Sequence, residues 1–158
     1  MELESHLVTA GYALYLFEVG ISRALRTIFG GNIQLQKDLD VFTLTRFILE
    51  HLHAKSSEPS VLSHLKIVDT LKHPARAFYD TIRSCQLFRN RLAHLHLHHP
   101  SAKEIKHYVN CVLDVLQIFE CPSEAESLRN FLLKFPLMNT KLPSNSCLLP
   151  FQDCFRYR

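Results

Sequence analysis

The sequence lacks tryptophan, contains only four glycines and has no Cys-x-x-Cys pair among its five cysteines. So few glycines exclude the collagen-like and low-complexity classes. An odd set of scattered cysteines is typical of reduced thiols, and it argues against a disulfide framework or a structural zinc site. We therefore predict a cytoplasmic or nuclear location, and we expect no metal and no cofactor.

Long hydrophobic runs are also absent. Residues 7–21 form the most apolar stretch, but Glu18 and two glycines interrupt it. A membrane helix needs about 20 consecutive apolar residues. The start Met-Glu-Leu-Glu-Ser is acidic, whereas secretory signals carry Lys or Arg ahead of their apolar region. The sequence therefore predicts neither membrane insertion nor secretion.

The composition is that of a globular chain, with 47% hydrophobic and 21% charged residues in 158. Apolar residues recur every three or four positions, and no segment shows the alternation of a β-strand. The sequence therefore predicts an all-α fold, a compact antiparallel bundle of four to six helices over residues 1–135. Residues 136–158, rich in Leu, Pro, Ser and Asn, are expected to form an irregular tail that packs on the domain or on a protein partner.

Capping and helix-breaking residues set the expected helix limits. In chain order we expect a long helix from about Leu3 to Phe29, a helix that opens at Asp40, a short helix capped by Ser60 that continues through Leu71, and a helix with Pro74 in its first turn that stops near His99-Pro100. The capping boxes Ser101-x-x-Glu104 and Ser123-x-x-Glu126 predict the last two helices, the second of which reaches about Phe135. Tyr12, Tyr15 and Phe17 are expected in the core, with a dimer surface as the alternative.

Positive charge is concentrated in one segment. Between residues 72 and 107, seven Lys or Arg residues are accompanied by only Asp80 and Glu104, which gives this segment a net charge of +5 and the rest of the chain −2. Six of the ten histidines lie in the same segment. Such a cluster is typical either of a solvated helix face or of a site that binds phosphate or a nucleic-acid backbone.

Residues 89–94, near the end of the basic helix, read Arg-Asn-Arg-Leu-Ala-His. On a regular helix Asn90 and His94 lie about 40° apart on one face, whereas Arg89 lies roughly 140° around from His94. The apolar residues Cys85 and Phe88 lie on the opposite face of this helix, which we expect to pack in the core. The polar face of Asn90 and His94 therefore needs solvent, a ligand or a second subunit.

The arrangement Arg89-x4-His94, with the polar Asn90 directly after the arginine, resembles the Arg-x4–6-His motif of HEPN domains (higher eukaryotes and prokaryotes nucleotide-binding). The literal match covers only residues 89–94, and the similarity in helix layout extends over residues 1–135. The resemblance implies a metal-independent endoribonuclease that acts on RNA as a homodimer. Other members of the family only bind nucleotides or serve as scaffolds.

The resemblance also implies the catalytic residues Arg89, Asn90 and His94. Metal-free RNA cleavage needs a base for the ribose 2′-OH, an acid for the departing 5′-oxygen and a fixed cation for the phosphate. One histidine cannot hold both protonation states, so a two-fold dimer would bring two copies of Arg89 and His94 into one cleft. Asn90 is expected to orient His94 or a phosphate oxygen. Substrate binding is assigned to Arg91, Arg83 and His98.

Three alternatives stay open. His94 and His98 have the i, i+4 spacing of a metal site, although no acidic residue follows them before Glu104. Arg89 and His94 are alternatively a surface pair without chemistry. The chain is alternatively a catalytically inactive HEPN-like module that binds a nucleotide or a protein partner through the same cleft. The low positive charge outside residues 72–107 favours this last possibility.

Overall fold

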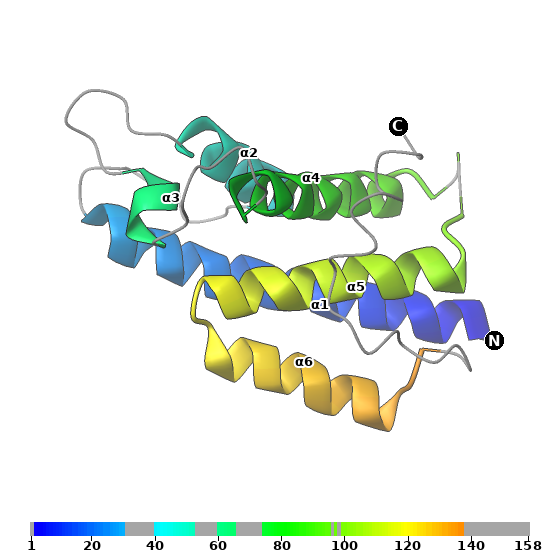
Figure 1. Ribbon diagram of the computed structural model, residues 1–158. Coiled ribbons are helices and arrows are strands. Elements are labelled where there is room, and N and C mark those ends of the chain that lie inside the picture. Colours follow the sequence, from blue (N-terminus) through cyan, green and yellow to red (C-terminus); the bar gives the residue numbers. More distant parts are fainter. Residues whose placement is uncertain are drawn as a thin grey trace.

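The computed structural model describes residues 2–30, 40–52, 60–65, 74–95, 97 and 99–137. Within these ranges it contains six helices and no strand, which confirms the predicted all-α class. The helices are α1 (Glu2–Phe29), α2 (Val41–Glu50), α3 (Val61–His64), α4 (Pro74–Ala93), α5 (Ala102–Ile118) and α6 (Pro122–Lys134). The last three long helices run alternately in opposite directions beside α1 (Figure 1). None of the described helices is long and apolar enough to cross a membrane.

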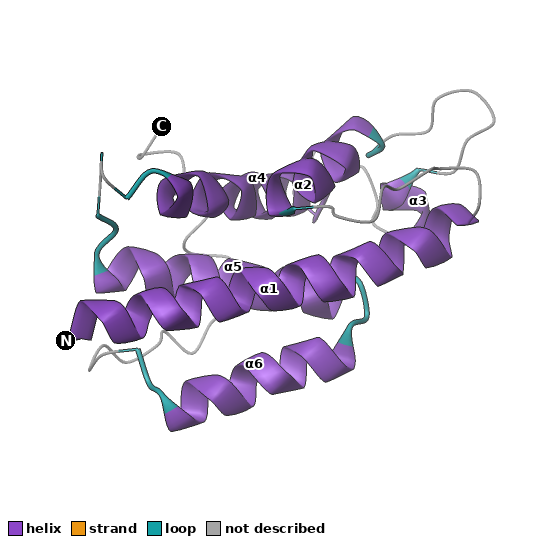
Figure 2. Ribbon diagram, turned by 180° about the vertical axis from the view of Figure 1, so that it is seen from behind, coloured by secondary structure: helices purple, strands orange, loops and turns teal. Residues whose placement is uncertain are grey.

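The core is built around α1, which packs against α5, α6 and α2. Its fully buried residues recur at three- and four-residue steps, as the sequence predicts: Ala10, Ala13, Phe17, Ile21 and Leu25. Seen from the side of α1, helices α2 and α4 lie on one side of it and α6 on the other (Figure 2). Helix α4 packs between α2 and α5, so the predicted basic helix is fixed along two of its faces.

The three aromatic residues of α1 have different environments. Phe17 is buried in the core, as predicted. Tyr12 is partly buried and packs edge-on against Phe131 of α6, with 4.6 Å between the ring centroids. Tyr15 is 59% exposed, so the prediction of a core position for this residue is wrong. The reason is that Tyr15 lies about 160° around the helix from the fully buried Phe17.

Two predicted helix limits are wrong. Helix α4 ends at Ala93, ahead of His99-Pro100, because the N–H of His94 is shared between the carbonyls of Asn90 (3.1 Å) and Arg91 (3.2 Å) and a turn follows. Helix α6 begins at Pro122, whose fixed φ suits the first helical position. Ser123 is therefore inside the helix, and its hydroxyl donates to a carboxylate oxygen of Glu124 (2.8 Å) instead of capping.

Other limits agree with the sequence. Asp40, Ser60 and Ser101 are side-chain N-caps of α2, α3 and α5. Helix α3 ends at His64, and the predicted continuation to Leu71 falls on residues 66–71, outside the described part of the chain. The predicted tail lies outside it as well, apart from Pro136 and Leu137. Leu137 is buried in the core.

Helix α6 is joined to α1 by an ion pair. A guanidinium nitrogen of Arg23 lies 2.7 Å from the buried carboxylate of Glu124. Nearby, the lack of a side chain at Gly20 of α1 leaves room for Leu116 of α5 and for Cys121, which precedes α6. A Cβ at position 20 would lie 3.0 Å from Leu116 Cδ2 and 3.3 Å from Cys121 Sγ. The hydrogen bond from Arg23 lowers the pKa of Glu124 to about 2, against the effect of burial.

We expect the substitution Glu124→Gln to lower the free energy of unfolding at neutral pH by about 1–3 kcal/mol. A carboxylate whose folded pKa is lowered stabilises the fold above its unfolded pKa, near 4.5, and this contribution disappears as the pH falls toward about 2. Urea titrations between pH 2 and pH 7 measure the effect. The curves of wild type and variant should converge in acid, and a constant gap across this range would contradict the assignment.

Candidate functional site

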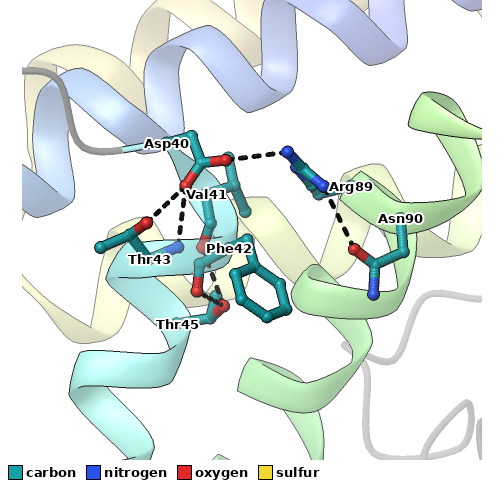
Figure 3. Close-up of polar contacts among 7 residues, drawn as sticks. All are labelled: Asp40, Val41, Phe42, Thr43, Thr45, Arg89 and Asn90. Carbon is teal, nitrogen blue, oxygen red and sulfur yellow. Dashed lines mark hydrogen bonds and ion pairs between the residues drawn. The ribbon is translucent and has the colours of Figure 1, made fainter.

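Arg89 of α4 reaches the N-terminus of α2 (Figure 3). Its Nη2 lies 2.9 Å from Oδ2 of Asp40, which is 49 positions earlier in the chain. The other terminal nitrogen, Nη1, donates to the amide oxygen of Asn90 at 3.4 Å, a long hydrogen bond. The side chains of Arg89 and Asp40 are 36% and 41% exposed, so the pair is accessible to ligands from solvent.

Asp40 is held at this place by its role as the N-cap of α2. It has an extended backbone conformation, and its Oδ1 accepts hydrogen bonds from the backbone N–H (2.9 Å) and the hydroxyl (2.8 Å) of Thr43. The two carboxylate oxygens therefore bind different groups. Oδ1 caps α2, and Oδ2 accepts the hydrogen bond from Arg89.

The guanidinium of Arg89 also lies over an aromatic ring. Its Cζ is 5.8 Å from the ring centroid of Phe42, the second residue of α2, within the range of a cation–π contact. Phe42 and Asn90 lie near the guanidinium in Figure 3. The position of Arg89 thus depends on three contacts, with Asp40, Phe42 and Asn90.

A second carboxylate, Glu18 of α1, adds to the electrostatics of this cluster. Burial raises the pKa of Glu18, and the charge of Asp40 acts in the same direction, while a backbone hydrogen bond with Val41 and the charge of Arg89 oppose the change. Burial acts to raise the pKa of Asp40 as well, but the hydrogen bonds from Thr43 and the charge of Arg89 bring it below its ordinary value. Arg89 is therefore matched by two acidic groups when both are ionised.

His94 is the first residue after α4, and its side chain is exposed. Its backbone N–H still bonds to the carbonyl of Asn90 in the last turn of the helix, at 3.1 Å. On ideal helix geometry Asn90 and His94 would lie about 40° apart around the axis of α4, and this shared side stays a prediction. Arg89 leaves the helix on a different side, toward α2, and Asn90 connects the two sides through its contact with Arg89.

The predicted substrate-binding residues are placed as follows. Arg91 donates to a carboxylate oxygen of Glu104 at 2.9 Å, and this ion pair, with both side chains about four-fifths buried, ties α4 to the first turn of α5. Arg83 donates from Nη1 to the amide oxygen of Gln86. Its buried Nε meets no acceptor in the described part of the chain. His98 lies outside the described residues.

Metal-binding groups do not gather in the described part of the chain. No three His, Cys, Asp or Glu side chains there lie close enough together to share an ion. The alternative metal pair of His94 and His98 falls partly outside the described ranges, since His98 is not among them.

Comparison with other proteins identifies no relative. The chain matches no family model, no curated protein and no solved structure. The assignment of a function therefore depends on the chemistry of the residues described above.

Sequence reasoning missed three members of the site, namely Asp40, Phe42 and Glu18. Asp40 gave a sequence signal only as a helix start, and Glu18 only as a charged residue within the most apolar stretch. Phe42 gave no signal, because it falls in an ordinary amphipathic helix. Their proximity to Arg89 comes from the way α1, α2 and α4 pack.

Proposed function

We propose that the chain is a HEPN-like endoribonuclease that cleaves RNA without a metal ion and acts as a homodimer. The observation that carries the proposal is the contact between Arg89 and Asn90 on an accessible part of α4, one turn before the exposed His94. An arginine, an amide and a histidine in this order supply a cation for phosphate, an orienting group and a proton-transfer group.

The reaction is an attack of the ribose 2′-oxygen on the neighbouring phosphorus. One imidazole removes the 2′-OH proton, the new O–P bond forms, and the bond from phosphorus to the 5′-oxygen breaks. A second, protonated imidazole gives its proton to the departing 5′-oxygen. The products are a 2′,3′-cyclic phosphate and a 5′-hydroxyl. Arg89 stabilises the charge on the non-bridging oxygens, because its planar guanidinium matches a phosphate edge.

A homodimer would supply the two imidazoles that the reaction needs, since each chain contributes one His94. An exposed apolar stripe on α1 supports association. Val8, Tyr15 and Val19 are 63%, 59% and 40% exposed, and their spacing places them within about 40° on one side of the helix. Exposed apolar stripes of this kind favour an interface.

Incubation of the purified protein with labelled RNA in EDTA tests the proposal. We expect cleavage that persists in the chelator, leaves 2′,3′-cyclic phosphate ends and spares an oligonucleotide with 2′-O-methyl groups. The substitution Arg89→Ala should lower the rate about 10²–10³-fold, because a preorganised charge on the transition state is lost. Cleavage that needs a divalent ion, or ends that carry a 3′-hydroxyl, would contradict it.

The second candidate is a catalytically inactive HEPN-like module that binds a nucleotide or a protein partner. The pairing of both Arg89 and Arg91 with carboxylates favours it, because their charges are then partly neutralised within the chain. Saturable nucleotide binding without any RNA cleavage in the same assay would support this module and exclude the nuclease.

A further inference from the structure

Asp40 occupies the place on Arg89 that a phosphate oxygen would take. Both ligands are anionic oxygens, and the 2.9 Å separation of Arg89 Nη2 and Asp40 Oδ2 is that of a charge-assisted hydrogen bond. With Glu18 also ionised, the two carboxylates outweigh the single guanidinium. A phosphodiester that approaches Arg89 therefore competes with Asp40 for the guanidinium.

The local structure allows Asp40 to give way without loss of its helix cap. Oδ1 keeps both hydrogen bonds from Thr43 when Oδ2 releases Arg89. Arg89 in turn keeps its contacts with the Phe42 ring and Asn90. Both side chains of the pair are also more than one third exposed, and ion pairs in such positions are weak because water screens them.

We propose that Asp40 regulates the Arg89 site: its carboxylate occupies the guanidinium in the free protein, and a nucleic-acid phosphate binds by replacing it. This inference rests on the phosphate-binding role of Arg89 in the proposed function. Asp40 is a positioning residue in this scheme, since it acts through Arg89 and touches no reacting atom. It also limits the affinity of the site for anions that have no other contacts with the protein.

The test is the binding of a fluorescein-labelled single-stranded DNA oligonucleotide, followed by anisotropy at low salt. DNA has the same phosphodiesters as RNA but no 2′-OH, so binding is measured without cleavage. We expect Asp40→Asn to bind the oligonucleotide about two- to fivefold more tightly than wild type. Asparagine is as good an N-cap as aspartate, and its NH2 group cannot accept from Arg89.

Three further variants make the result specific. Asp40→Ser keeps a capping side chain that is too short to reach Arg89, and it should show the same gain. Glu126→Gln makes the same change of charge on an exposed residue of α6, away from α2 and α4, and should show a smaller gain. When Arg89 is replaced by glutamine, the further substitution Asp40→Asn should raise the affinity for the oligonucleotide no more than Glu126→Gln does.

Each outcome decides the inference. A gain for both Asp40 variants that exceeds Glu126→Gln and needs Arg89 supports it. The inference is overturned if Glu126→Gln raises the affinity for the oligonucleotide as much as the Asp40 variants do. It is also overturned if their gain in affinity persists without Arg89, or if they show no gain. The proposed nuclease activity is tested separately, since a protein that never cleaves RNA can still show this Arg89-dependent gain.

Discussion

The substitution His94→Ala is expected to lower the rate of RNA cleavage by about 10²–10⁴-fold, which is the contribution of one proton-transfer group. In the proposed dimer both the base and the acid are lost at once, so the upper end of this range is expected. His94 is exposed and lies beyond the last helical residue of α4, so its loss leaves the core intact. The measurement is single-turnover cleavage of labelled RNA in EDTA.

The matched control is His64→Ala, which removes another exposed histidine from the end of α3. This variant should cleave at nearly the wild-type rate. Unfolding curves should be the same for both variants and wild type. If His94→Ala keeps more than about a tenth of the activity, the histidine is not a proton-transfer group.

A mixing experiment with the same variant tests whether the cleft is composite. Wild type re-equilibrated with an equal amount of His94→Ala should show about half the activity that it shows alone, because every heterodimer lacks one imidazole. Independent sites would keep full activity. The result distinguishes a shared cleft from two separate ones.

The substitution Phe88→Ala is expected to lower the free energy of unfolding by about 3–5 kcal/mol. Phe88 is fully buried and stacks on Tyr108 of α5, with ring centroids 5.0 Å apart and planes 13° from parallel. Removal of the ring leaves a cavity where α4 meets α5, in addition to the lost apolar burial. Chemical denaturation followed by circular dichroism measures the effect.

Phe135→Ala is the matched control, because it removes the same side chain where it is 51% exposed, after the end of α6. A loss of less than about 1 kcal/mol is expected there. Similar losses for the two variants would show that Phe88 does not pack in the core as described. Phe88 directly precedes Arg89, so its packing on Tyr108 also holds this part of α4 against α5.

The sequence alone determined the helical class, most of the core face of α1 and three of the helix caps. These features depend on local chemistry: apolar residues three or four apart bury one face of a helix, and a side-chain oxygen at Asp40, Ser60 or Ser101 satisfies backbone N–H groups a few residues away. Asn90 and His94 are predicted to share a face for the same reason, since ideal helical geometry is fixed over one turn.

The tertiary structure decided what these residues meet. The packing of α2 against α4 brings Asp40 to Arg89 across 49 positions, and nothing in the spacing of the two residues indicates it. The contact of α4 with the start of α5 likewise pairs Arg91 with Glu104. Periodicity specifies which side of a helix is buried but not which helix covers it, because that choice depends on the fit of side chains far apart in the chain.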